Sequence, residues 1–103
     1  MGIVMRIIQQ YDPAHESEFM MLEKKFAALE KGRSDFPKGR RLQPVSGGEP
    51  TNTLIWQCDF PDIDAAYKAL NFFSGDEKHE ELFRQQVVFM KQVKIEFYKT
   101  LDF

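Results

Sequence analysis

The sequence predicts a single α+β domain in the order β-α-β-β-α-α-β. Short segments alternate apolar and polar residues, as half-buried strands do, and longer segments repeat apolar residues every three or four positions, as helices do. Asp, Pro and Gly fall where these segments begin and end. Because the 103 residues contain no linker-like stretch, residues 1–103 are expected to form one domain.

The first elements are a strand and a helix. Residues 3–8 are rich in β-branched side chains and have the length of a buried strand. Asp12 and Pro13 supply a helix cap and a favourable first helical residue, and Gly32 supplies a stop. The helix face expected to be buried carries apolar residues at spacings of 3, 4 and 3, namely Phe19, Leu22, Phe26 and Leu29.

The middle of the chain predicts two antiparallel strands. Residues 41–45 are expected to form a short edge strand, because Pro44 cannot donate a hydrogen bond to a central ladder. Residues 46–50 form a turn cluster. Residues 53–60 are the clearest strand, with one face formed by Leu54, Trp56, Cys58 and Phe60.

The last part predicts two helices and a strand. Asp62 can cap a helix that ends at Gly75, and Asp76 can cap a second helix. The second helix is expected to carry an apolar side formed by Leu82, Phe83, Gln86, Phe89 and Met90. The closing strand alternates Val93, Ile95 and Phe97 with Lys94, Glu96 and Tyr98. This order is that of a ferredoxin-like fold, a four-stranded antiparallel sheet with helices on one face.

The strand alternation also predicts a second, mixed sheet face. If Trp56 and Cys58 face the helices, the opposite face carries Arg6, Ile8, Ile55, Gln57, Asp59, Glu96 and Tyr98. An exposed patch of this kind usually marks an interface, and a second copy can cover it by two-fold symmetry. We therefore expect a homodimer, with Arg6 paired to Asp59 or Glu96 within or across chains because buried charges need partners.

This layout resembles the dimeric α+β barrel superfamily, in which two ferredoxin-like chains pack their sheets together. The segments GRRLQP (residues 39–44) and TNTLIW (residues 51–56) and the ending EFY (residues 96–98) are similar to small bacterial NIPSNAP-like proteins of uncharacterised function. The wider group includes antibiotic-biosynthesis monooxygenases and haem-degrading monooxygenases. The resemblance implies a fold and no particular activity.

Charge and composition exclude several classes of function. With 14 basic and 16 acidic residues the net charge is -2, which argues against a nucleic-acid partner. No apolar run approaches the roughly 20 residues of a membrane span. The single Cys58 allows no intramolecular disulfide, and His15 and His79 lack metal-ligand spacing. A cytoplasmic location is expected, with no membrane partner, no metal and no cofactor.

Four residues are the ligand-binding candidates. Trp56 and His79 resemble the strand tryptophan and helical histidine of the haem-degrading branch, although the first strand lacks that branch's asparagine. The alternatives are a core role for Trp56 and a solvated His79 within DEKHEE (residues 76–81). Arg40 and Arg41 could receive a carboxylate or phosphate, or could instead pair with acidic helix residues. Cys58 is expected to be an inert buried thiol.

The sequence is compatible with two functions. The favoured one is a non-catalytic module that binds a small hydrophobic or anionic molecule or another protein, since no catalytic constellation is evident. The alternative is a cofactor-free or haem-dependent monooxygenase acting on a small aromatic or hydrophobic substrate. A cavity between sheet and helices with a polar group inside would indicate a ligand site. Its expected aromatic lining comes from Trp56, Phe72, Phe73, Phe83 and Phe89.

Overall fold

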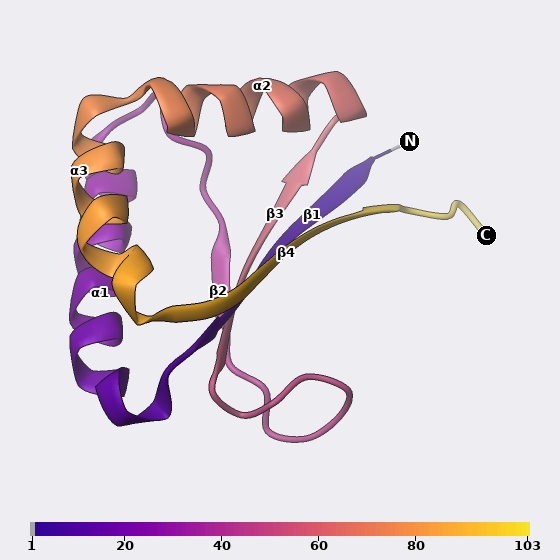
Figure 1. The fold of residues 1–103 in the computed structure, drawn as a ribbon. Coiled ribbons are helices and arrows are strands. Elements are labelled where there is room, and N and C mark those ends of the chain that lie inside the picture. The colour runs from indigo at the N-terminus through magenta and orange to yellow at the C-terminus, as the bar shows by residue number, and fades with distance from the viewer. Residues whose placement is uncertain (1) are drawn as a thin grey trace.

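A computed structural model describes residues 2–103 and has the predicted order of elements. The four strands form an antiparallel sheet in the order β2-β3-β1-β4, and the three α-helices lie on one side of it (Figure 1). The elements are β1 (Ile3–Tyr11), α1 (Glu16–Gly32), β2 (Arg40–Leu42), β3 (Thr53–Phe60), α2 (Ile63–Gly75), α3 (Glu77–Gln86) and β4 (Met90–Lys99).

Aspartate side chains cap the helical segments as the sequence predicts. Asp12 Oδ1 accepts a hydrogen bond from the Ala14 backbone N–H at 2.9 Å and begins a short 3-10 turn (Pro13–His15) ahead of α1. Asp62 caps α2, and Asp76 Oδ2 accepts from the backbone N–H of His79 at 3.0 Å at the start of α3. These caps satisfy backbone donors that have no partner inside the helix.

The last helix is shorter than predicted. α3 ends at Gln86, a 3-10 turn (Val87–Phe89) follows, and Met90 already belongs to β4. The helix ends early because the residues after it pair with the end of β1. The Phe89 carbonyl accepts a hydrogen bond from the Asp12 backbone N–H at 2.8 Å, and Met90 pairs with Tyr11. Tertiary pairing therefore overrides the helical spacing of Phe89 and Met90.

The edge strand also differs from its predicted range. β2 covers only Arg40–Leu42, at the sheet edge as expected, and pairs with β3. Beyond it, residues 43–52 leave the sheet and return as a loop (Figure 1). The loop is anchored on the far side of the sheet by an ion pair between Glu49 Oε2 and Lys94 Nζ at 2.8 Å.

The strand register confirms the predicted division of the sheet into two faces. Met5 pairs with Cys58 and Ile7 with Trp56 on the helix-covered face. The core on that face contains Met5, Trp56, Cys58, Phe60, Ala66 and Ala69. On the opposite face, Arg6 lies between Gln57 of β3 and Glu96 of β4.

The apolar part of the opposite face is already buried within one chain. Ile8 and Ile55 are 4% and 9% exposed, although the sequence pattern suggested an open patch. They are register partners, and Ile8 also pairs with Lys94, where the 43–52 loop is anchored. The uncovered remainder is mostly polar. No helix in residues 2–103 combines the length and the apolar character needed to cross a membrane.

Candidate ligand-binding cavity

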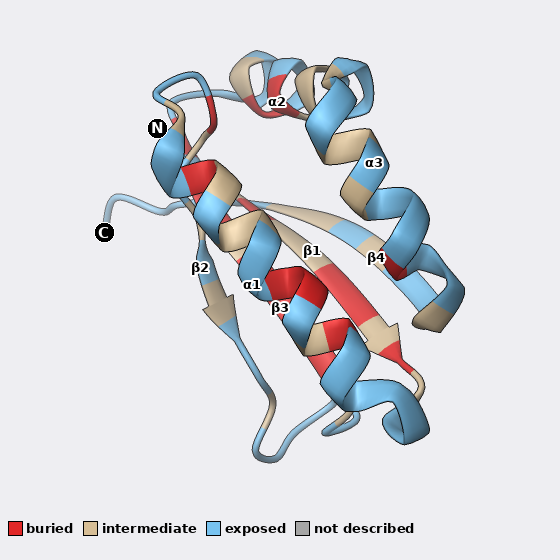
Figure 2. Cartoon of the chain, turned by 90° about the vertical axis from the view of Figure 1, so that its left-hand side faces the viewer, coloured by how far each residue is buried: buried red, intermediate tan, exposed pale blue. Residues whose placement is uncertain are grey.

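A cavity of about 450 Å³ lies between the helix-covered face of the sheet and all three helices. Its volume is within the range of small-molecule sites. It exists because α3 packs against α1 and α2 and leaves the inner face of β4 partly open. Val93 and Ile95 of β4 are each 46% exposed, and Figure 2 colours β4 as intermediate or exposed, whereas β3 is mostly buried.

Aromatic rings from different elements form much of the apolar wall. Phe26 comes from α1, Trp56 from β3, Phe73 from α2 and Phe83 from α3, and Phe36 comes from the segment between α1 and β2. Trp56 meets Phe73 edge to face, with ring centroids 5.7 Å apart. Of the five rings expected from the sequence, Phe72 and Phe89 are not among the residues that line this cavity.

Trp56 is buried in the core and also lines the cavity. Gly39 lies against its indole ring. A Cβ atom on residue 39 would lie 2.2 Å from Trp56 Cε2, which is far inside van der Waals contact. The absence of a side chain at Gly39 therefore allows the indole to occupy this position.

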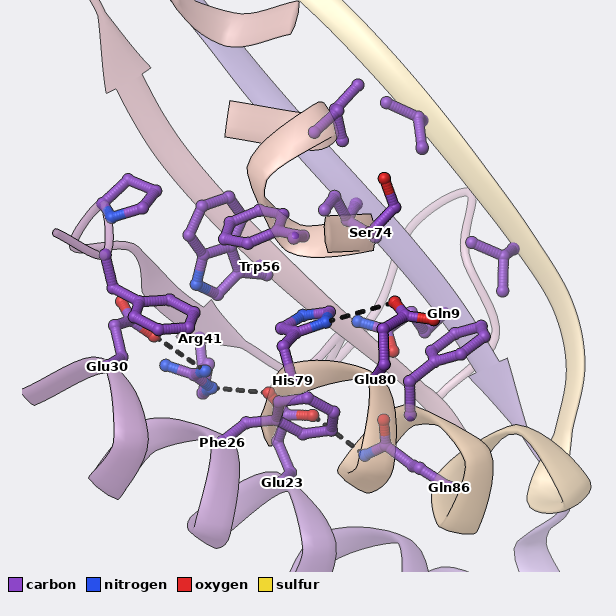
Figure 3. Close-up of a pocket in the computed structure, with 18 of the residues that line it drawn as sticks. Gln9, Glu23, Phe26, Glu30, Arg41, Trp56, Ser74, His79, Glu80 and Gln86 are labelled. Carbon is purple, nitrogen blue, oxygen red and sulfur yellow. Dashed lines mark hydrogen bonds and ion pairs between the residues drawn. The ribbon is translucent and has the colours of Figure 1, made fainter. Parts of the chain in front are cut away.

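The polar wall centres on a buried charge network. Arg41 Nε donates to Glu23 Oε2 at 2.6 Å, and Arg41 Nη2 lies 2.9 Å from Glu30 Oε2. Gln86 Nε2 donates to the other Glu23 oxygen at 2.9 Å (Figure 3). The Gly39 backbone N–H donates to the other Glu30 oxygen at 2.6 Å. Each buried carboxylate oxygen of these two residues thus has a partner.

Glu23 and Glu30 were not predicted as site residues, although the sequence contains a signal for them. With Phe19 and Phe26 they follow spacings of 4, 3 and 4, so they share the buried face of α1. Two acids on a buried helix face require a buried base, and the cluster of basic residues after α1 contains one in Arg41. That combination could have predicted the network.

His79 is not the solvated residue that its charged neighbours suggested. Its ring stacks on Phe73 with centroids 4.9 Å apart and an interplanar angle of 11°, and the rings of Phe26 and Phe36 lie nearby. The side chain is 21% exposed and lines the cavity. Burial lowers the pKa of His79 below its ordinary value of 6.5, against the opposing charges of Glu80, Asp76 and Glu23.

Arg33 holds the start of α3 against the end of α1. Its Nη1 lies 2.8 Å from Asp76 Oδ1, its Nη2 lies 2.8 Å from Asp35 Oδ2, and its guanidinium carbon lies 4.7 Å from the Phe36 ring centroid. Because Asp76 also caps α3, this arrangement positions His79 and Phe36 together.

The two candidate arginines do not converge. Arg41 faces the cavity and is engaged by Glu23 and Glu30. Arg40, the preceding residue in an extended strand, lies on the opposite face across from Gln57. The structure therefore brings together Trp56, His79 and Arg41, and separates Arg40 from them.

Two polar groups on the cavity wall lack a hydrogen bond within the described chain. The Nδ1 atom of His79 is buried and unpaired, with Glu80 Oε1 at 3.9 Å. Gln9 of β1 is 8% exposed, and its side-chain amide makes no hydrogen bond to residues 2–103. Of the two, the Nδ1 atom of His79 is fully buried, and a buried polar atom without a partner is unusual in a folded protein.

The remaining chemical candidates lie apart from this polar wall. Cys58 is buried, as expected, and burial raises the pKa of its thiol to about 11, which makes it a poor nucleophile. His15 is exposed and bonded to Glu18 Oε2 at 2.6 Å. Among residues 2–103 there is no group of three or more His, Cys, Asp or Glu side chains that could hold a metal ion.

On the opposite sheet face, Arg6 has a different partner from the one predicted within a chain. Its Nε donates to Gln57 Oε1 at 2.9 Å, and its guanidinium carbon lies 5.3 Å from the Tyr98 ring centroid. Glu96 instead accepts a hydrogen bond from the Tyr98 hydroxyl at 2.5 Å. The neighbouring amide and phenol thus replace the intrachain ion pair to Asp59 or Glu96.

No protein-family model and no curated protein matches this sequence. Solved structures do match its fold. A NIPSNAP family protein from Agrobacterium tumefaciens has a TM-score of 0.81 at 14% identity, covering 99% of this chain and 88% of that one. A NIPSNAP domain protein from Burkholderia xenovorans has a TM-score of 0.79 at 13% identity, covering 100% and 97%.

A third match is a Caulobacter crescentus protein provisionally classed as an antibiotic biosynthesis monooxygenase. It has a TM-score of 0.75 at 14% identity, covering 98% of this chain and 91% of that one. The chain has the ferredoxin-like fold of these NIPSNAP and monooxygenase-like proteins. The resemblance expected from the sequence is confirmed at the level of the fold, which by itself assigns no activity.

Proposed function

We propose that this protein is a non-catalytic module that binds a small, mainly apolar molecule in the cavity between sheet and helices. One observation carries the proposal: the cavity of about 450 Å³ is lined by aromatic rings and by the buried, unpaired Nδ1 atom of His79. This is the combination of apolar wall and few polar groups that small-molecule sites use.

The cavity favours an uncharged or cationic ligand over an anionic one. Arg41, the guanidinium at its wall, is already engaged by Glu23 and Glu30. Glu80 adds a third carboxylate to the lining, and Arg40 lies on the other face of the sheet. An anion would meet three carboxylates and one paired guanidinium, which is electrostatically unfavourable.

A monooxygenase is the second candidate, and two observations favour it. The fold neighbour from Caulobacter crescentus carries that provisional class, and His79 offers an imidazole at the cavity wall. The lining does not suit haem, because its two propionates would add negative charge to a cavity that already contains Glu23, Glu30 and Glu80 and only one, already paired, arginine. A cofactor-free oxygenase acting on a small aromatic substrate is therefore the form of this candidate that we retain.

We also propose that the chain forms a homodimer through the sheet face opposite the helices. Arg6, Gln57, Glu96 and Tyr98 form a connected polar and aromatic surface there, beside the exposed Asp59. Because Ile8 and Ile55 are covered within the chain, the proposed interface depends on these polar contacts more than the sequence pattern indicated.

Native mass spectrometry of protein purified from its host, with an absorption spectrum of the same sample, tests the binding proposal. We expect a small-molecule mass that is lost on denaturation. Ile95→Arg, which places a bulky positive charge at the open side of the cavity, should lose this mass, whereas the exposed Val88→Arg should retain it. Equal retention by both variants would place the molecule elsewhere, and a Soret band would overturn the argument against haem.

A further inference from the structure

The cavity has a polar end whose groups accept hydrogen bonds and carry negative charge. Gln9 from β1 and His79 and Glu80 from α3 all line it, and Figure 3 shows their side chains facing the same space. Among residues 2–103 the Glu80 carboxylate has no Lys or Arg partner, unlike Glu23 and Glu30, and its only near neighbour of basic type is the His79 ring at 3.9 Å.

Gln9 supplies the independent sign that a ligand belongs at this end. The residue is 8% exposed, and its amide has no hydrogen-bond partner among residues 2–103. The amide borders the cavity, where a ligand can bond to it, and the Nδ1 atom of His79 nearby is fully buried without a partner. Solvent-exposed glutamines need no such explanation, but Gln9 faces a cavity large enough to hold a ligand.

The charge at this end is negative. Phe26, Phe36 and Phe73 surround the His79 ring and keep it among apolar side chains. The titratable and charged groups around His79 are Glu80 and Asp76 on its own helix segment and Glu23 on α1. Because burial keeps His79 neutral at pH 7, it does not compensate the carboxylates.

We propose that the ligand is a hydrophobic primary amine, bound as its ammonium ion. This assignment rests on the proposed function. Glu80, the Gln9 carbonyl oxygen and the unpaired ring nitrogen of His79 accept its three N–H donors, and the apolar body occupies the aromatic part of the cavity. A hydroxyl at the same place would use fewer of these acceptors, and a carboxylate would be repelled by Glu80.

Isothermal titration of the full chain with three probes of similar shape tests this assignment. The probes are 4-phenylbutylamine, 4-phenylbutan-1-ol and 5-phenylpentanoate, compared at pH 7.5. We expect the amine to bind about tenfold more tightly than the alcohol, since hydrogen bonds to charged groups are the stronger ones. The carboxylate should bind more weakly than the alcohol.

Glu80→Gln should reduce the affinity of the amine to about that of the alcohol and leave the alcohol unchanged. Glu81→Gln, an exposed change on the same helix, is the matched control and should alter neither affinity. An amine that binds no better than the alcohol, or an advantage that survives Glu80→Gln, would overturn the amine assignment while leaving cavity binding intact. Absence of binding by all three probes would contradict both proposals.

Discussion

The side chain of His79 lies in an environment very different from that of its sequence neighbours. The five residues around it in DEKHEE are charged, yet its ring lies among Phe26, Phe36 and Phe73 on the inner side of α3. Its charged neighbours point in other directions, because successive side chains of a helix are rotated by about 100°. A histidine flanked by acids can therefore be the inward-facing member of its turn.

Burial of His79 predicts a specific pH dependence of stability. Its pKa is lowered in the folded state, so the unfolded chain takes up a proton first as the pH falls below about 6.5. The free energy of unfolding should therefore decrease from pH 7.5 to pH 5.5. In urea denaturation the decrease should be smaller in His79→Phe than in the wild type.

His15→Phe is the control for this experiment, because His15 is half-exposed and lies outside the cavity. That variant should keep the wild-type decrease. If His79→Phe loses as much stability on acidification as the wild type, the proposed burial of a neutral His79 is incorrect.

At the scale of elements, Arg41 connects β2 to α1 through Glu23 and Glu30. Arg41→Met would leave two buried carboxylates without their cation, and we expect a loss of about 3 kcal/mol in the free energy of unfolding. Arg40→Met is the matched change on the exposed side of the same strand and should cost less than about 0.5 kcal/mol. Equilibrium denaturation measures both.

A rescue experiment separates charge from packing at this site. Adding Glu23→Gln and Glu30→Gln to Arg41→Met removes the uncompensated charges and should recover part of the lost stability. If Arg41→Met is no more destabilising than Arg40→Met, then the network is not the main link between these elements.

The elements themselves were largely predictable from the sequence, and their junctions were not. Strand 53–60 and the helix that ends at Gly75 match their predicted ranges because alternation, an aspartate cap and a glycine stop are local signals. α3 ends before Phe89 because that residue bonds to Asp12, far away in sequence. A contact between residues so far apart in sequence leaves no signal in the local residue pattern.

The cavity was predictable only in part. Trp56, His79 and Arg41 were candidates, but they come from three elements whose relative placement depends on α3 packing against α1. Gln9, Glu23 and Glu30 were not among the site residues predicted from the sequence. Their burial becomes evident once the helix face, the strand register and the partner Arg41 are combined.

At the scale of the whole molecule, the exposed sheet face predicts self-association. Sedimentation velocity should give a dimer for the wild type and a shift towards monomer at low concentration for Arg6→Ala, which removes the contact to Gln57 and Tyr98. Arg84→Ala, an exposed change on α3, should leave the dimer intact. A monomeric wild type would contradict the dimer proposal, and an unchanged Arg6→Ala would remove Arg6 from the interface.

The central claim is that the space between the two layers is a binding site, and the single tryptophan reports on it directly. Trp56 lies on the cavity wall, so its fluorescence should change when a ligand enters. Titration with the uncharged 4-phenylbutan-1-ol should give a saturable change that Val88→Arg keeps and Ile95→Arg loses. A change that never saturates, or that is the same in both variants, would contradict a binding site in this cavity.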